Sequence, residues 1–115
     1  MLEGIEVARL SAQIASDKQA SDIMVLDARN VCSFTDYFVL ATTGGNRQTR
    51  AVYDEITQAL KQQGVTPHHH EGRPDSGWLL IDYGDVIIHI FSPHEREYYQ
   101  MEEMWHEAAV VLQIQ

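Results

Sequence analysis

The chain has 115 residues, of which 44% are hydrophobic and 22% charged, so it suits one globular domain over residues 1–115 and is not expected to be disordered. Its net charge of −9 disfavours direct, sequence-specific binding to nucleic acid and favours a basic partner, although solubility also explains an acidic balance. Its single cysteine, Cys32, excludes an internal disulfide. We find no secretory leader and no apolar run long enough for a membrane span, and we predict a cytoplasmic protein.

Apolar periodicity and turn residues predict the elements in chain order. Helices are expected over residues 2–19, 46–63 and 92–105, the last of them begun by Ser92, Pro93 and Glu95. Strands are expected over residues 23–26, 37–41, 66–71, 78–82 and 85–91, and an apolar tail over residues 108–114. This order predicts an α/β (α+β) fold, a mixed β-sheet of about five strands packed by helices.

A hairpin is expected at Tyr83-Gly84, which places Asp82 opposite Asp85. One face of this hairpin is apolar and belongs to the core, with Leu79, Ile81, Val86 and Ile88. The other face carries Trp78, Leu80, Ile87, His89 and the two aspartates. Opposed carboxylates are unfavourable, and a metal ion, a basic partner or a splayed, solvated turn each relieves the repulsion. The pair Trp78 and His89 fits either core packing or an exposed interface anchor.

Two patterns suggest enzyme chemistry. The run His68-His69-His70-Glu71 offers metal ligands, but alternate residues of a strand point to opposite faces, so a solvated edge strand is the preferred interpretation. Gly44-Gly45 before a helix, with Asp82 and Asp85, is similar to nucleotidyltransferases that use Mg and a nucleotide. The spacing of the aspartates does not match, so this enzyme is the alternative function. No catalytic residue, metal site or cofactor is predicted.

Several stretches, in order and spacing, resemble the ribosomal silencing factor (Iojap) family over about residues 5–108. They are ASDIMVLD (20–27), FTDYFVLA (34–41), Arg47-Gln48, Glu71-Gly72, WLLIDYGDVIIHIF (78–91) and REYYQMEEMW (96–105). The chain departs from the family pattern at Thr43-Gly44-Gly45-Asn46, and it has Met101 and Met104 where leucine is common. The histidine run is not a feature of the family.

The resemblance implies a nucleotidyltransferase-like fold without enzyme activity. It also implies binding to the large ribosomal subunit through ribosomal protein L fourteen, a small basic β-barrel at the subunit interface. Members of the family block joining of the small subunit and silence translation when nutrients are short. Homodimers are known in the family.

Residues and resemblance together predict a partner-binding set. It comprises Glu71, Trp78, Asp82, Tyr83, Asp85, His89, Arg96, Tyr99, Glu102 and Trp105. Asp82, Asp85 and Glu102 are expected to meet lysine and arginine side chains of the partner. Trp78 and Tyr83 are expected to supply apolar area. Trp105 fits the core and the interface equally well.

Overall fold

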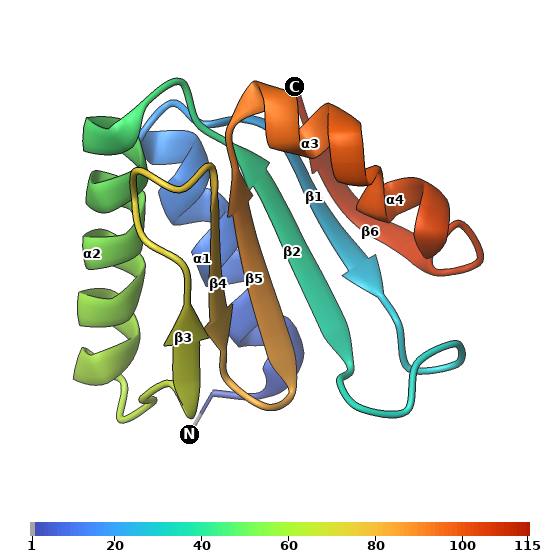
Figure 1. Cartoon of the computed structure of the whole chain (residues 1–115). Coiled ribbons are helices and arrows are strands. Elements are labelled where there is room, and N and C mark those ends of the chain that lie inside the picture. Colours follow the sequence, from blue (N-terminus) through green and yellow to red (C-terminus); the bar gives the residue numbers. More distant parts are fainter. Residues whose placement is uncertain (1) are drawn as a thin grey trace.

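The structure is a computed structural model that describes residues 2–115 (Figure 1). Its helices are α1 (Gly4–Asp17), α2 (Asn46–Gln62), α3 (Pro93–Tyr99) and α4 (Met101–Met104). Its strands are β1 (Ser21–Asp27), β2 (Tyr37–Thr42), β3 (His69–Glu71), β4 (Trp78–Asp82), β5 (Val86–Phe91) and β6 (Ala109–Ile114). They form one sheet in the order β3-β4-β5-β2-β1-β6, with β2 and β5 parallel and the other neighbours antiparallel. The predicted α+β fold with a mixed sheet is confirmed, and the sheet of the described residues has six strands.

Helices α1 and α2 cover one face of the sheet (Figure 1). Their apolar residues recur at the three- and four-residue spacing of an amphipathic helix. The buried members are Val7, Ala8, Ala12, Ile14, Ala15, Val52, Ile56 and Leu60. They form one core with the residues of β4 and β5 that were predicted to face inward. None of the helices within residues 2–115 has the length and apolarity that crossing a membrane requires.

The opposite face of the sheet is covered only in part, by the two short helices α3 and α4. Every residue of the central strands β2 and β5 is buried, and the apolar residues on this face, such as Phe38 and Ile87, form a second core with Met101 and Ala108. Trp78 and Trp105 are only partly buried at the border of this core. Incomplete coverage therefore leaves large apolar side chains within reach of solvent.

The register predicted for the β4–β5 hairpin is wrong. Asp82 pairs with Ile87, and the Tyr83 N–H donates to the carbonyl of Val86 at 2.9 Å, so Gly84 and Asp85 form the turn. Gly84 has φ +85°, a conformation that two-residue hairpin turns require at this position and that glycine adopts without strain. The apolar face assigned to Leu79, Ile81, Val86 and Ile88 is nonetheless confirmed. The observed pairing differs from the predicted one by two residues, and a shift by an even number of residues leaves every side chain on the same face of the sheet.

The helix predicted over residues 92–105 is interrupted. It begins as predicted, with the Ser92 Oγ accepting the Glu95 N–H and Pro93 in the first turn. At Gln100 the backbone turns left-handed, with φ +47° and ψ +52°, which separates α3 from α4. This turn directs Met101 into the second core, where it is buried. Burial of Met101 outweighs the local preference for a continuous helix.

The apolar tail predicted over residues 108–114 is in fact a strand for most of its length. β6 pairs antiparallel with β1, placing Ile114 beside Ile23 and Leu112 beside Val25. Val110, Val111 and Ile114 are β-branched, a residue type that favours strands, and β1 offers an unpaired edge beyond β2. The backbone of β1 is therefore hydrogen-bonded on both sides.

Candidate functional site

An apolar hollow of about 270 Å³ lies on the sheet face opposite α1 and α2. We call it the groove. The sheet supplies Phe38, Trp78, Leu80, Ile87 and His89, and the remaining lining residues are Phe34, Tyr99, Met101, Met104 and Trp105. These residues come from the loop before β2, from β2, β4 and β5, and from α3 and α4. Segments far apart in the sequence thus build one apolar depression.

Aromatic rings line both sides of the groove. Trp78 packs against Tyr99 with ring centroids 4.4 Å apart, and Trp105 stacks on Phe38 at 5.3 Å. Phe34 contacts the edge of Trp105 at 6.2 Å and is nevertheless 62% exposed. Large apolar side chains left in solvent next to one another are characteristic of protein-binding sites, where aromatic residues contribute much of the binding energy.

His89 fixes the position of Trp78. The indole Nε1–H donates to the Nδ1 atom of His89 at 3.0 Å. Burial lowers the pKa of His89 to about 4, so its ring is neutral at neutral pH and accepts this hydrogen bond. Of the two alternatives left open by the sequence, the structure shows packing, because the rings of Trp78 and His89 lie 5.8 Å apart and His89 is buried. Trp78 is half-buried beside the groove, and its role as an interface anchor stays a prediction.

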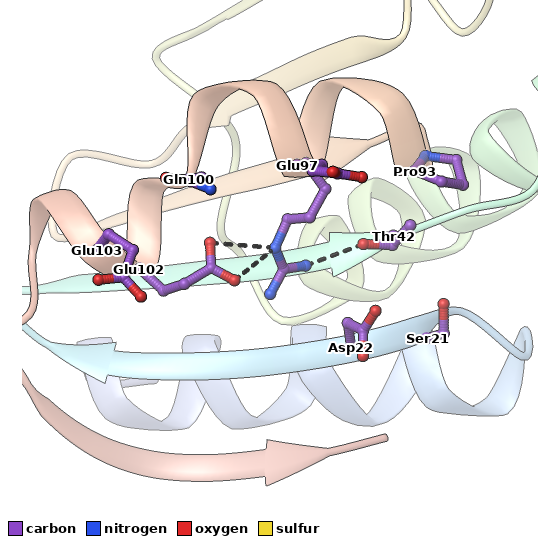
Figure 2. A pocket seen from close by; sticks show the side chains of 9 residues that line it. Ser21, Asp22, Thr42, Pro93, Glu97, Gln100, Glu102 and Glu103 are labelled. Carbon is purple, nitrogen blue, oxygen red and sulfur yellow. Dashed lines mark hydrogen bonds and ion pairs between the residues drawn. The ribbon is translucent and has the colours of Figure 1, made fainter.

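A polar hollow of about 430 Å³ lies between α3, α4, the start of β1 and the end of β2. We call it the acidic pocket. Asp22, Glu97, Glu102 and Glu103 line it together with a single basic residue, Arg96 (Figure 2). Four carboxylates around one guanidinium leave this pocket with an excess of negative charge. A cationic side chain of a partner is the group that such a surface attracts.

Arg96 links three elements beneath the acidic pocket. It is 8% exposed, its Nε donates to both carboxylate oxygens of Glu102 at 3.0 and 3.3 Å, and its Nη1 donates to the Thr42 hydroxyl at 3.0 Å (Figure 2). Glu102 belongs to α4 and Thr42 to β2, so the guanidinium holds α4 and the end of β2 against α3. Its first role in the structure is to support the helices beside the groove.

Substitution of Arg96 by methionine is expected to lower the free energy of unfolding by about 2 kcal/mol, because it leaves Glu102 and Thr42 without their buried donor. Urea denaturation measures this change. Arg50 is exposed on α2, so Arg50→Met is the matched control and is expected to change stability by less than about 0.5 kcal/mol. Equal stabilities of the two variants would contradict a structural role of Arg96.

The groove and the acidic pocket are neighbours on either side of the α3–α4 junction. Tyr99 and Met101 line the groove, whereas Gln100, the left-handed residue between them, lines the pocket. One partner surface can therefore contact both at once. The combination is an apolar, aromatic centre next to an acidic rim, which suits a basic protein better than a small charged substrate.

Comparison with known proteins identifies the family. The model of the family described as "Ribosomal silencing factor during starvation" matches residues 2–115. The chain belongs to the ribosomal silencing factor family. It is 32% identical over 102 residues to Ribosomal silencing factor RsfS of Bacillus subtilis, covering 89% of this chain and 86% of that protein. It is also 33% identical to the chloroplastic protein Iojap of Zea mays, covering 87% of this chain and 43% of that protein.

The fold agrees with solved structures. A crystal structure of a protein from Chromobacterium violaceum superposes with a TM-score of 0.85 at 33% identity, covering 91% of this chain and 88% of that chain. A structure from Bacillus halodurans superposes with a TM-score of 0.77 at 30% identity, covering 88% and 94% of the two chains. The family predicted from the sequence motifs is thus confirmed.

The structure brings six of the predicted binding residues of this silencing factor to the two hollows. Trp78, His89, Tyr99 and Trp105 line the groove, and Arg96 and Glu102 line the acidic pocket. Glu71 lies nearby, since it is exposed on the edge strand β3 and shares a small hollow with Trp78. Their role in binding stays a prediction, and two of them, His89 and Arg96, are buried beneath the two hollows.

The other predicted residues lie elsewhere. Tyr83 is 8% exposed in the core beneath α1 and α2, and burial raises its pKa to about 12. Asp85 is exposed next to Gly4, at the amino end of α1, where a carboxylate is favourable to the helix dipole. Asp82 is half-buried, and its Oδ1 accepts the Gly84 N–H at 2.7 Å. The predicted patch around the hairpin turn is therefore split, and Asp82 does not face Asp85.

The arrangement expected of a nucleotidyltransferase is not assembled. Gly44 and Gly45 follow the carboxyl end of β2, whereas Asp82 ends β4 and Asp85 directly precedes the start of β5. Because β2 and β5 are parallel and in register, these groups are separated by about 17 Å, the length of β5. A glycine-rich turn holding phosphates there is too far from the two carboxylates to share a metal-bound nucleotide with them.

The histidine run does not form a ligand cluster. His69 Nδ1 lies 3.5 Å from Asp82 Oδ2 and its Nε2 lies 3.3 Å from Glu71 Oε2, whereas the ring of His70 packs against Tyr53. Among the described residues, no three histidine, cysteine or acidic side chains are placed to hold a metal ion together. The run therefore occupies the edge of the sheet with its histidines pointing to different neighbours.

Sequence reasoning missed part of the site. Phe34 lies between the strands predicted over residues 23–26 and 37–41, where no element was predicted, and Phe38 was assigned only to the second of these strands. The signal for Phe34 was a large apolar residue between two polar ones, Ser33 and Thr35, outside any predicted helix or strand. No sequence signal indicated Asp22, which has φ +49° at an irregular position in the pairing of β1.

Proposed function

We propose that this chain represses translation by binding the large ribosomal subunit and obstructing the joining of the small subunit, with no catalytic step. The proposed contact is ribosomal protein L fourteen, a small basic β-barrel. Membership of a family described as a silencing factor during starvation supports the regulatory role and its link to nutrient shortage. A homodimer of the free protein stays a prediction from the resemblance.

The observation that carries this proposal is an exposed aromatic groove flanked by four carboxylates. The groove supplies apolar area that is buried on binding, and the acidic pocket selects a basic partner by charge. The same charges, together with a net charge of −9, oppose contact with RNA phosphates. A ribosomal protein with a basic surface satisfies both conditions.

The proposed block of subunit joining is steric and depends only on the volume of the bound domain. An interface of ordinary size buries about 800 Å² on each partner, roughly an eighth of the 6613 Å² surface of this chain. The remaining surface of a 13.1 kDa domain, including the layer formed by α1 and α2, faces away from the groove. If the groove is seated at the subunit interface, that layer occupies the space that the small subunit requires.

The decisive experiment is recovery of ribosomal particles from a cell lysate on the immobilised chain. Large subunits are expected without small ones, and added chain is expected to reduce the association of purified subunits on sucrose gradients. Recovery of intact ribosomes, or of no ribosomal particles, would contradict the proposed function. For the enzyme alternative, calorimetry with nucleotides and Mg²⁺ is the test, and the proposal expects no binding.

Adjacent tyrosines on α3 give a matched pair of variants. Tyr99 packs on Trp78 in the groove, whereas Tyr98 is 72% exposed and does not line it. Tyr99→Ala is expected to weaken binding to purified large subunits by about 10-fold, and Tyr98→Ala by less than about 2-fold. Biosensor titration of the two variants measures the difference. A larger effect at Tyr98 would place the contact outside the groove.

A further inference from the structure

His89 carries a hydrogen-bonding atom that no side chain in the described structure satisfies. The residue is 4% exposed in the middle of β5, on the face of the sheet that forms the groove. Its Nε2 is buried and has no hydrogen-bond partner. The hydroxyls of Ser11, Thr35 and Tyr83 are likewise buried without a partner, but of these four residues only His89 lines the groove. Buried polar atoms are nearly always paired, with protein or with water, so the position of His89 leaves its Nε2 available to a water molecule or to a group that enters the groove.

The contact with Trp78 defines the chemistry of this atom. An indole Nε1–H can only donate, so the Nδ1 of His89, 3.0 Å away, must carry a free lone pair. In a neutral imidazole the proton then resides on Nε2. Burial, which lowers the pKa of His89 to about 4, keeps the ring in this form at neutral pH. The unpaired atom is therefore a donor.

The surroundings of the ring offer no acceptor of ordinary strength. Its nearest rings are those of Phe38, Trp78 and Phe91, with centroids between 5.8 and 5.9 Å away. Two methionines of α4, Met101 and Met104, line the same hollow, and Met104 is 66% exposed. Methionine side chains are unbranched and adaptable, so the hollow is able to widen around an inserted group.

We propose that the groove selects an uncharged group that bears a hydrogen-bond acceptor, and that His89 Nε2–H donates to this acceptor when the basic partner docks. Backbone carbonyls, side-chain amides and hydroxyls belong to this class. The inference rests on the proposed function in that it names the chemistry by which the same surface recognises its partner.

The groove and the acidic pocket are proposed to bind different groups of the partner. Lysine and arginine side chains carry donors only, so they cannot satisfy His89, and they would lose hydration in an apolar groove. The acidic pocket on the other side of the α3–α4 junction is where such side chains are expected. A matching partner surface therefore presents a neutral acceptor-bearing group next to a cation.

A pair of small probes of similar shape tests the groove without a ribosome. Acetophenone carries a carbonyl acceptor, and ethylbenzene lacks it. With the full chain labelled with ¹⁵N-histidine, acetophenone is expected to bind at least 5-fold more tightly than ethylbenzene and to shift the Nε2–H resonance of His89. In His89→Phe, the preference is expected to disappear. Equal affinities, an unshifted resonance, or no binding of either probe would overturn the inference.

A second measurement distinguishes failure of the inference from failure of the proposed function. His89→Phe is expected to bind purified large subunits at least 10-fold more weakly than the original chain while remaining folded by circular dichroism. If the variant binds equally well, the acceptor contact is refuted and the silencing function stands. If the original chain does not bind large subunits, the proposed function fails, and the probe pair still reports on the groove. The probe result on the original chain is decisive even if the variant does not fold.

Discussion

Replacement of Glu97 and Glu103 by lysine is expected to weaken binding to purified large ribosomal subunits by about 100-fold at low ionic strength, or about 2.7 kcal/mol. Both residues line the acidic pocket and are exposed, so the substitutions should leave the fold intact. The proposed partner is basic, and two attractive contacts become repulsive. Titration at increasing salt is expected to shrink the difference, because salt screens exposed charges.

The control for Glu97→Lys/Glu103→Lys must change the net charge of the chain by the same amount at a site away from the acidic pocket. Asp54 and Glu55 are exposed on α2, the helix layer on the opposite side of the sheet, and Asp54→Lys/Glu55→Lys alters the total charge by the same amount. We expect a change of less than about 3-fold, due to weaker long-range attraction alone. If both double variants lose affinity equally, net charge decides the binding and the acidic pocket is not a contact.

The same experiment distinguishes two candidate binding surfaces: the hairpin turn, which the sequence predicted, and the acidic pocket, which the structure shows. Asp82→Lys/Asp85→Lys tests the hairpin turn, where Tyr83 is buried and Asp85 lies by the start of α1. We expect this variant to resemble the α2 control in its binding. A loss as large as that of Glu97→Lys/Glu103→Lys would restore the turn as a binding site.

The parts of the fold that follow from side-chain periodicity were predictable. Alternation in β4 and β5 assigned Leu79, Ile81 and Ile88 to the core correctly, although the pairing itself was wrong. The face of the sheet on which a side chain lies depends only on whether its position in the strand is odd or even. The register, in contrast, depends on which residues form the turn. Here the requirement for positive φ at Gly84 decided the register, and Asp82 supports the turn by accepting the Gly84 N–H.

The parts that depend on tertiary contacts were not predictable. Residues 92–105 have helical periodicity throughout, but packing of Met101 and the ion pair of Arg96 with Glu102 stabilise a left-handed turn at Gln100. Likewise, the β-branched residues of the tail favour a strand, but the edge of β1 with which β6 pairs could not be read from the sequence. Since the groove lies beside this turn, its existence is a consequence of the same contacts. Trp78 and Tyr99 could be named from the sequence, but their meeting at 4.4 Å could not.

Acidification from pH 6.5 to pH 4 is expected to destabilise the native chain through His89. Burial among aromatic rings lowers the pKa of this residue to about 4, whereas in the unfolded chain it titrates near 6.5. Between these values the unfolded state binds a proton that the native state does not. The free energy of unfolding therefore falls as the pH falls, by up to about 3 kcal/mol. Well above pH 6.5, His89 is deprotonated in both states and does not change the free energy of unfolding with pH.

Urea denaturation at pH 7.5, 6.5, 5.5 and 4.5 measures this slope, and His89→Phe is the matched variant because it preserves an aromatic ring at the site. The slope of the variant between pH 6.5 and 4 is expected to be smaller by the contribution of one proton. The Arg29 guanidinium lowers the pKa of Asp27, which therefore titrates in a more acidic range and does not obscure the comparison. Parallel pH profiles of the two proteins would show that His89 is able to take up a proton in the folded state, and would thereby remove the basis for treating its Nε2 as a fixed donor in the groove.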